Sequence, residues 1–303
     1  MKVLVTGAGG FIGQQCLPLL VYQGHEVHAL SSRVRASDSV HWWQADLLDA
    51  SAVHRVVASI RPTHLLHLAW LTTPGHYWTS PDNLRWLAAS LELAHAFHQH
   101  GGQRVVMAGT CAEYEWGHGR CVEGLTPLAP ATLYGSCKHA LQQTLNAFAR
   151  QTGIGAAWGR IFFTYGPHEH PSRLVPSVVN SLLAGKPAEC SIGTQARDFL
   201  FVEDVAGAFV ALLDSGVSGA VNIGSGVPVT IRDLVLSVAD RIGSRGLVRF
   251  GVRPVAPDEP ELLVADVTRL TTEVGWRPRH SLASGLDLTI RWWQEQLSAT
   301  RTT

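Results

Sequence analysis

Hydrophobic and polar residues alternate along the first half of the chain with two different periods. Short apolar runs typical of buried parallel strands are KVLVT, HEVHAL, VHWWQA, THLLHLA, QRVVMAG and AAWGRIFF. Between these runs, apolar residues recur every three or four positions, which predicts helices over residues 12–23, 51–60, 82–99 and 132–152. This order of elements indicates βαβ units around a parallel sheet that is covered by helices on both faces.

The second half of the chain has a different pattern. After TYGPHEHPSR the pieces become shorter and are separated by glycine and proline. We expect the strand RDFLFV and a helix over 203–213 to rejoin the main sheet, and the remaining pieces, with a helix over 283–298, to form a smaller lobe. The prediction is a doubly wound, Rossmann-type parallel α/β sheet over 1–166 and about 197–223, with a C-terminal α/β substrate lobe over about 167–196 and 224–300. Ligands of such sheets bind at the carboxyl ends of the strands.

Composition narrows the class of protein. The 303 residues include 24 basic and 24 acidic side chains, and 46% are hydrophobic, which is an ordinary globular balance and not that of a nucleic-acid binder. No apolar run approaches the roughly 18 residues of a membrane span, and we see no secretion signal. The cysteines form no CxxC pair, which favours free thiols in a reducing cytoplasm; they are Cys16, Cys111, Cys121, Cys137 and Cys190.

The histidines raise the question of a metal site. His95, His98 and His100 lie near the end of a predicted helix, and His168 and His170 flank a glutamate. A closed zinc site needs a Cys/His set with characteristic spacing, and none accompanies these histidines. We therefore predict no metal and expect the helix-terminal histidines to face solvent or the helix dipole. His168 and His170 remain candidates for the substrate cleft because they follow YGP.

Three glycines connect the first predicted strand to its helix. Gly7, Gly10 and Gly13 are spaced three apart in VTGAGGFIGQQ. Glycine allows a tight turn and a close approach of the backbone to a pyrophosphate, which then lies at the positive end of the helix. The spacing favours a dinucleotide, and the alternative is a plain β–α turn. A P-loop is excluded because no Gly-Lys-Ser/Thr follows.

A tyrosine and a lysine stand four residues apart on the helix predicted over 132–152. Tyr134 and Lys138 therefore share one helix face, and Leu141, Leu145 and Phe148 continue an apolar stripe meant for burial. In isolation such a pair is a rim tyrosine beside a surface lysine. The other motifs of the chain favour a catalytic pair instead.

The glycine loop and the Tyr134–Lys138 pair together resemble the short-chain dehydrogenase/reductase superfamily. AGTCAEY, GRIFFTYGP, RDFLFVEDVA and NIGSG are similar to motifs of its extended branch, the NAD(P)-dependent nucleotide-sugar epimerases, dehydratases and reductases, and the resemblance covers nearly the whole chain. It implies an enzyme that acts on a nucleotide-diphosphate sugar through Thr110, Tyr134 and Lys138. Besides the glycines, Tyr134 and Lys138, it implies cofactor contacts at Phe11, Ile12, Asp46, Leu47, Leu68 and Ala69. Relatives pair through helices equivalent to 82–100 and 132–152, so we expect a homodimer.

The resemblance also assigns a role to each catalytic side chain. A tyrosine ordinarily has a pKa of about 10, too high for ready proton exchange at neutral pH. The Lys138 ammonium and an oxidised nicotinamide would lower the pKa of Tyr134, which would then act as the general acid for a carbonyl oxygen. Thr110 would hold the same oxygen, and Lys138 would also hydrogen-bond the nicotinamide ribose.

The residues after the second predicted strand bear on the choice of cofactor. NAD-specific sites of this fold usually end that strand with an acid that binds the ribose 2′-hydroxyl. Here Ser31, Ser32 and Arg33 follow instead, and they suit a 2′-phosphate, with Arg35 as a second candidate contact. We predict that NADP(H) is preferred and that NAD(H) is possible; the alternative is a solvated polar loop.

The residues beside Thr110 bear on the reaction. Dehydratases of this family carry Asp-Glu directly after the catalytic threonine, where this chain has Cys111 and Ala112, and Glu113 lies one residue too late. C4-epimerases usually carry the acid that is missing after the second strand. We expect a reductase of a 4-keto, often 6-deoxy, nucleotide sugar; the alternatives are a C4-epimerase and a non-catalytic NADP-binding regulator on the same fold.

Several residues are candidates for substrate binding. Arg197 and Arg253 are candidates for the substrate pyrophosphate, because a dianion in a cleft needs fixed cations. The alternative is an ion pair with Asp198 or Glu259. Phe163 stands where the family usually has asparagine, which removes a polar contact. The expected substrate contacts are Thr110, Phe163, Arg173, Val175, Arg197 and Arg253.

Overall fold

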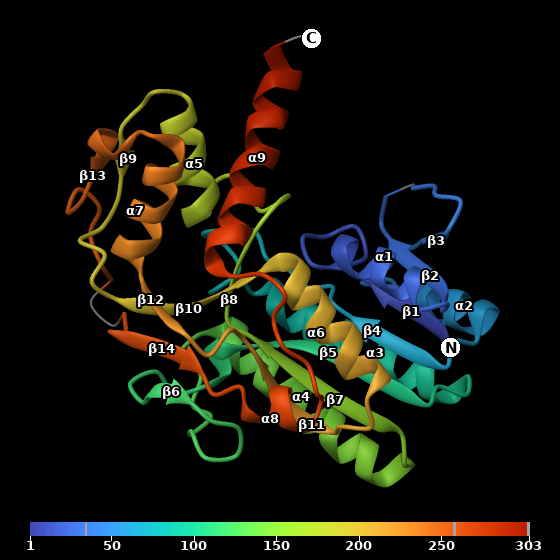
Figure 1. Ribbon diagram of the computed structural model, residues 1–303. Helices are drawn as coiled ribbons and strands as arrows, with labels where there is room; N and C mark the ends of the chain where they lie inside the picture. The colour runs from blue at the N-terminus through green and yellow to red at the C-terminus, as the bar shows by residue number, and fades with distance from the viewer. Residues whose placement is uncertain (34, 257–258, 302–303) are drawn as a thin grey trace.

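A seven-stranded parallel sheet forms the centre of the larger part of the molecule (Figure 1). The computed structural model describes residues 1–33, 35–256 and 259–301. The strand order is β11-β7-β5-β4-β1-β2-β3, so the order reverses between β1 and β4. The strands are β1 (Lys2–Thr6), β2 (Glu26–Ser31), β3 (His41–Gln44), β4 (His64–His67), β5 (Arg104–Thr110), β7 (Gly155–Ile161) and β11 (Gly219–Ile223). This is a doubly wound, Rossmann-type α/β sheet, which confirms the predicted fold class.

Helices cover both faces of this sheet, because the strands are apolar on both sides. All seven residues of β5 are buried, for example. One face packs against α2 (Ala50–Ile60), α3 (Asp82–Gln99) and α4 (Leu133–Thr152). The other packs against α1 (Gly13–Tyr22) and α6 (Val202–Asp214). These five helices lie within two residues of the ranges predicted from the periodicity.

The strand RDFLFV does not join the main sheet, and that expectation was wrong. It forms β10 (Ala196–Phe201) in a second sheet of order β12-β10-β14-β6, in which β8 also pairs with β10. The buried Asp198 carboxylate accepts hydrogen bonds from Ser225 N and Gly226 N at 2.6 and 2.9 Å, which ties β10 to the smaller lobe. Among the described later elements, α6 and β11 return to the main sheet, and Leu270, from a short helix after β11, packs into the same core. The other strands are β6 (Gly119–Cys121), β8 (Phe163–Tyr165), β12 (Pro228–Thr230) and β14 (Leu262–Ala265).

The smaller lobe has its own apolar core of helices packed on the second sheet (Figure 1). Its helices are α5 (Leu174–Leu183), α7 (Ile231–Ile242) and α9 (Leu282–Arg301), with the pair β9 (Ala188–Glu189) and β13 (Val248–Arg249). The short elements are α8 (Thr268–Thr272), η1 (Cys111–Glu113) and η2 (Arg245–Leu247). The predicted domain limits stay a prediction.

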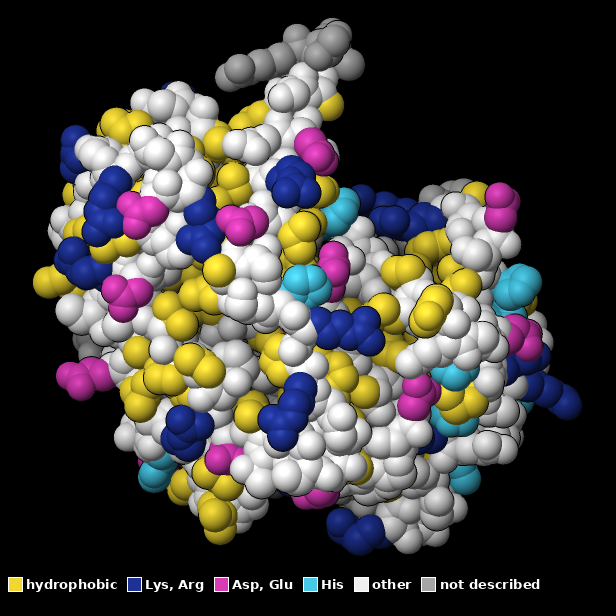
Figure 2. Space-filling model, viewed as in Figure 1, with side chains coloured by type: hydrophobic (Ala, Val, Ile, Leu, Met, Phe, Trp, Pro, Cys, Tyr) yellow, Lys and Arg dark blue, Asp and Glu magenta, His cyan; other side chains and the backbone are white. Residues whose placement is uncertain are grey.

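Acidic and basic side chains are interspersed over the face shown in Figure 2, with apolar side chains between them. This agrees with the balanced charge of the sequence, 24 basic against 24 acidic residues. None of the helices in the described parts of the chain has the length and apolar content that crossing a bilayer requires.

Candidate active site

The carboxyl ends of the main-sheet strands open into a cleft of about 1670 Å³. Its lining comes from the glycine loop after β1, from the ends of β2, β4 and β5, and from lobe segments around β8, α5 and β10. Pockets for a single drug-sized ligand measure about 300–1,000 Å³, so this cleft has room for a dinucleotide and a second ligand. The reversal of strand order lies at the same place, as expected for a cofactor site.

The glycine loop leaves little room for side chains. Gly7 has φ 68°, a left-handed conformation that favours glycine, and a Cβ there would lie 2.7 Å from Ala69 N. A Cβ on Gly13 would collide with the Gly7 carbonyl oxygen, which also accepts a 2.9 Å hydrogen bond from Gly10 N. The loop therefore packs closely against the end of β4 and leads directly into α1, an arrangement suited to a pyrophosphate.

The residues predicted to bind the cofactor lie along this part of the cleft, with one exception. Those in its lining are Gly7, Gly10, Phe11, Ile12, Gly13, Ser31, Ser32, Arg33, Asp46, Leu47, Leu68, Ala69 and Tyr134. Arg33 is exposed, and Arg35 also lines the cleft, with Nη2 3.4 Å from the Gly9 oxygen. Lys138 is the exception, since it is buried behind the lining.

The three predicted catalytic residues are brought together by β5 and the first turns of α4. Thr132 caps α4 by accepting a hydrogen bond from the first turn, which places Tyr134 at the start of the helix. Thr110 is the last residue of β5, and it lines the cleft together with Tyr134. Lys138 lies one turn further along α4, and its Nζ donates a 2.9 Å hydrogen bond to the Ala108 carbonyl oxygen.

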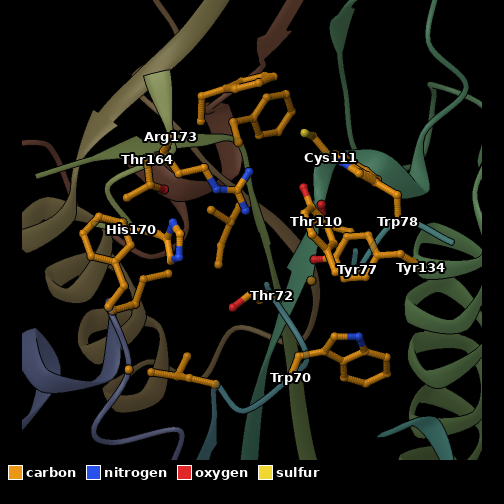
Figure 3. A pocket seen from close by; sticks show the side chains of 18 of the residues that line it. Trp70, Thr72, Tyr77, Trp78, Thr110, Cys111, Tyr134, Thr164, His170 and Arg173 are labelled. Atoms are coloured by element: carbon orange, nitrogen blue, oxygen red, sulfur yellow. The ribbon is translucent and has the colours of Figure 1, made fainter. Parts of the chain in front are cut away.

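Aromatic rings surround Tyr134, and sequence reasoning missed them. Tyr77 and Trp78 meet the Tyr134 ring edge to face, with centroids 4.9 and 5.7 Å away, and they lie beside it in Figure 3. The Lys138 Nζ lies 3.9 Å from the centroid of the Trp70 ring, a cation–π contact. The signal was the aromatic run WLTTPGHYW within a chain of ten tryptophans. These rings make the wall of the cleft beside the phenol largely apolar.

This apolar wall corrects the expected titration of the catalytic pair. Burial raises the pKa of Tyr134 above its ordinary value, and Thr110 only partly opposes the shift. Burial lowers the pKa of Lys138 to about 7, so its ammonium is a weaker source of positive charge than expected. In the protein by itself the pKa of Tyr134 is therefore raised and not lowered, and the stabilising effect of the Lys138 charge on the phenolate stays a prediction. The charge of an oxidised nicotinamide remains an available cause of a downward shift.

Glu113, which lies one residue too late for the dehydratase pair, is not part of the cleft lining. Its carboxylate is fully buried and accepts hydrogen bonds from Arg160 Nε at 2.8 Å, Trp158 Nε1 at 2.9 Å and Thr110 N at 2.8 Å. Cys111 does line the cleft, and burial raises the pKa of its thiol. Glu113 thus holds the end of β5 in place, and its carboxylate has no free oxygen for proton transfer.

The expected substrate residues divide into those in the cleft and one outside it. Thr110, Phe163, Arg173, Val175 and Arg197 are in the lining. Arg197 Nη2 makes a 2.8 Å ion pair with Glu259, which is the alternative expected for it. Arg253 is exposed and outside the lining, because its loop turns back to Cys190, whose oxygen accepts from Arg253 N at 3.2 Å. The structure therefore gives no support to Arg253 as a pyrophosphate contact.

Two of the three residues directly after YGP line the cleft. His170 lines it, as expected, and so does Glu169, which the sequence reasoning considered only as part of a metal motif. His168 turns away and packs against Trp292, with ring centroids 4.5 Å apart. Glu169 is therefore a site residue that only the structure reveals.

One group of possible metal ligands lies elsewhere among the described residues. Donor atoms of His54, Glu92 and His95 lie within 4.8 Å of one another, on α2 and α3 and outside the cleft. The Glu92 carboxylate pairs with both histidines, and these contacts by themselves explain why the three side chains lie close together. That the active site uses no metal stays a prediction.

Known proteins resemble this chain in both sequence and structure. The NAD dependent epimerase/dehydratase family matches residues 3–224. UDP-glucuronic acid decarboxylase 1 from Danio rerio is 26% identical over 98% of this chain and 73% of its own. UDP-glucose 4-epimerase from Mycolicibacterium smegmatis is 28% identical over 98% of this chain and 99% of its own. The structure of MoeE5 in complex with UDP-glucose and NAD superposes with a TM-score of 0.87 at 30% identity, covering 98% of this chain and 100% of its own. The chain thus belongs to the NAD-dependent epimerase/dehydratase family, and it is an enzyme of the extended short-chain dehydrogenase/reductase type whose relatives act on nucleotide sugars.

Proposed function

We propose that the protein transfers hydride between a nicotinamide cofactor and C4 of a nucleotide-diphosphate sugar, and that its reaction is the reduction of a 4-keto sugar. The observation that supports this most is the meeting of Thr110 and Tyr134 at the cleft that the glycine loop also lines. Lys138 lies behind them, one helical turn from the phenol. Family membership as an enzyme sets aside the non-catalytic regulator.

Within this proposal each side chain acts at a defined atom. The Thr110 hydroxyl and the Tyr134 phenol hold the C4 oxygen between them by hydrogen bonds. The nicotinamide, when bound, supplies the hydride. The Tyr134 Oη gives its proton to the C4 oxygen as the carbonyl becomes an alcohol, and the Lys138 ammonium stabilises the phenolate that remains.

Dehydration is disfavoured by the residues that follow Thr110. An acid–base pair for removal of water has to face the sugar, and here the cleft presents Cys111 with its raised thiol pKa. Glu113, the carboxylate closest to Thr110 along the chain, is held by Arg160 and has no exposed surface. The site therefore favours simple hydride transfer over elimination.

The preference for NADP(H) is part of this proposal. Ser31, Ser32, Arg33 and Arg35 all line the cleft just after β2, where an NAD-specific site usually has an acid. Guanidinium groups pair well with a 2′-phosphate through charge-assisted hydrogen bonds. A homodimer that pairs through α3 and α4, and a cytoplasmic location, also belong to the proposal.

A C4-epimerase that keeps NAD bound is the second candidate. The similarity to the UDP-glucose 4-epimerase over 98% of this chain favours it. The same three residues would serve, because an epimerase removes a hydride from C4 and returns it to the other face. The difference is that an epimerase shows no net consumption of cofactor.

The test is a panel of nucleotide sugars assayed with and without added cofactor. A reductase consumes NADPH continuously with a dTDP-, GDP- or CDP-linked 4-keto-6-deoxy sugar, followed in the nicotinamide absorbance band. An epimerase instead interconverts UDP-glucose and UDP-galactose without added cofactor, which would replace the reductase proposal. UDP-glucuronic acid belongs in the panel because of the decarboxylase relative. If no sugar reacts under either condition, the proposed function is refuted for these substrates.

A further inference from the structure

Glu169 is a buried carboxyl group that the proposed chemistry does not use. It follows the YGP turn, lines the cleft and is only 9% exposed. Its Oε2 has no surface exposed to solvent and no hydrogen-bond partner among the described residues. Buried carboxyl oxygens in folded proteins are normally hydrogen-bonded, so an unpaired oxygen beside a ligand cleft points to a partner that the ligand brings.

The surroundings of Glu169 favour its neutral form. Burial raises its pKa to about 8, although the charge of Arg173 and the backbone of Gly166 oppose the shift. At neutral pH most of the carboxyl groups are therefore protonated and present one O–H donor and one C=O acceptor. Arg173 itself lies over the Tyr77 ring, 5.2 Å from its centroid, and makes no ion pair with the Glu169 carboxyl in the described structure.

A second unpaired polar atom lies in the lining of the same cleft. Thr164 Oγ1 is also buried without a hydrogen-bond partner, and Thr164 lines the cleft from β8. Figure 3 shows Thr164, His170 and Arg173 across the cleft from Thr110 and Tyr134. Glu169 directly precedes His170 in the chain and lines the same cleft.

The turn before Glu169 contains a backbone conformation that is unfavourable in free energy. His168 adopts φ 68°, which is unfavourable for a residue with a Cβ, and its ring is packed against Trp292 on α9. A strained turn that brings a carboxyl group into a largely apolar cleft is typical of a ligand-binding segment. The burial of Glu169 is therefore built into the fold.

We propose that the Glu169 carboxyl hydrogen-bonds a hydroxyl group of the sugar ring, and that Thr164, on the wall opposite Tyr134, binds a neighbouring hydroxyl. This inference rests on the proposed function, because it places the sugar between the two walls of the cleft. A hydroxyl group matches a neutral carboxyl in both directions, since each has one donor and one acceptor. The positive charge of Arg173 would repel an ammonium group of a ligand bound beside Glu169. The ligand is therefore a neutral polyhydroxy sugar and not an amino sugar with a free amine.

The test measures sugar recognition separately from nucleotide recognition. UDP-glucose and UDP are titrated calorimetrically at pH 7 with NAD present, in a Tyr134→Phe background that prevents turnover. Glu169→Gln keeps a donor and an acceptor in the same shape, and Glu169→Leu removes both. Glu189→Leu, at an exposed glutamate on β9 outside the cleft, is the matched control. Thermal melting and NAD affinity report whether each variant stays folded, and the isosteric Thr164→Val is a second variant.

We expect Glu169→Leu to weaken UDP-glucose about ten- to a hundredfold and UDP by less than about twofold. Glu169→Gln should stay within about threefold of the parent for both ligands, and Thr164→Val should weaken UDP-glucose about two- to tenfold. Equal losses for UDP-glucose and UDP, an unchanged UDP-glucose affinity in Glu169→Leu, or a glutamine variant as damaged as the leucine variant would each overturn the proposal.

Failure of the proposed function gives a different result. In that case neither UDP-glucose nor UDP binds to the protein with Glu169 intact, and the inference falls with it. Loss of sugar binding that appears only after Glu169 is changed leaves the proposed function in place. The two ideas are therefore refuted by different arms of the same experiment.

Discussion

Replacing Glu113 by glutamine tests the buried charge network behind the catalytic threonine. The Glu113 carboxylate accepts from Arg160 Nε at 2.8 Å and from Thr110 N at 2.8 Å, and both ionic side chains are at most 2% exposed. Arg160 also donates to Tyr114 Oη at 3.1 Å, which does not neutralise its charge. Glutamine has the same shape, but it leaves the guanidinium without a counter-charge and turns an NH₂ group toward one of the donors.

The expected loss in the free energy of unfolding is large because the Arg160 charge stays buried without its partner. Breaking a buried ion pair on one side costs about 3–5 kcal/mol, a large part of the roughly 5–15 kcal/mol by which proteins are stable. A chain of 303 residues has an unfolding entropy of about 0.6 kcal/mol/K near its melting temperature. Glu113→Gln should therefore melt about 5–8 °C below the wild type.

Thermal melts and urea titrations at pH 7 measure this effect. Glu115→Gln is the control, since Glu115 pairs with His118 at the surface and such pairs contribute about 0–1 kcal/mol. The double variant Glu113→Leu/Arg160→Met should recover part of the loss, because no unpaired charge remains. If Glu113→Gln lowers the free energy of unfolding by less than about 1 kcal/mol, the assignment of a buried, unscreened ion pair is refuted.

Four further predictions concern the cleft. Arg33→Ala should weaken NADPH about ten- to a hundredfold and leave NADH nearly unchanged in fluorescence titrations; equal losses would contradict a 2′-phosphate site. Tyr134→Phe should lower turnover about 10²–10⁴-fold with cofactor affinity unchanged; a rate within about tenfold of wild type would remove the phenol from the chemistry. Burial lowers the pKa of Lys138 from 10.5 to about 7, so between these values the unfolded chain binds more protons and stability rises with pH. Lys138→Met should reduce that rise in urea titrations, and an unchanged slope would contradict the shifted pKa. Arg197→Ala should raise the apparent Michaelis constant for the nucleotide sugar more than that for the cofactor. A loss of affinity confined to the cofactor would place Arg197 in another part of the site.

The sequence by itself determined the elements whose signals are local. The apolar periodicity predicted the helices over 51–60 and 82–99, and these end within one residue of α2 and α3. The glycine loop could be predicted because the conformation of Gly7 and the crowding at Gly13 depend on neighbours within a few positions. The spacing of Tyr134 and Lys138 was equally readable, since a helix places residues four apart on one face. The family resemblance followed from these local motifs.

Tertiary structure alone decided the features that depend on residues far apart in the chain. RDFLFV has the composition of a strand, but its sheet is decided by Asp198, which binds the backbone of a loop 27 and 28 residues later. Arg197 pairs with Glu259 at a separation of 62 residues; the sequence offered Asp198 and Glu259 as possible partners, and only the fold decided between them. Burial also depends on residues far apart in the chain. The aromatic rings that bury Tyr134 and raise its pKa come from another loop. The cleft beside the unpaired Glu169 carboxyl exists only after both lobes have formed. Local periodicity encodes secondary structure, whereas desolvation and long-range pairing arise only from the packed fold.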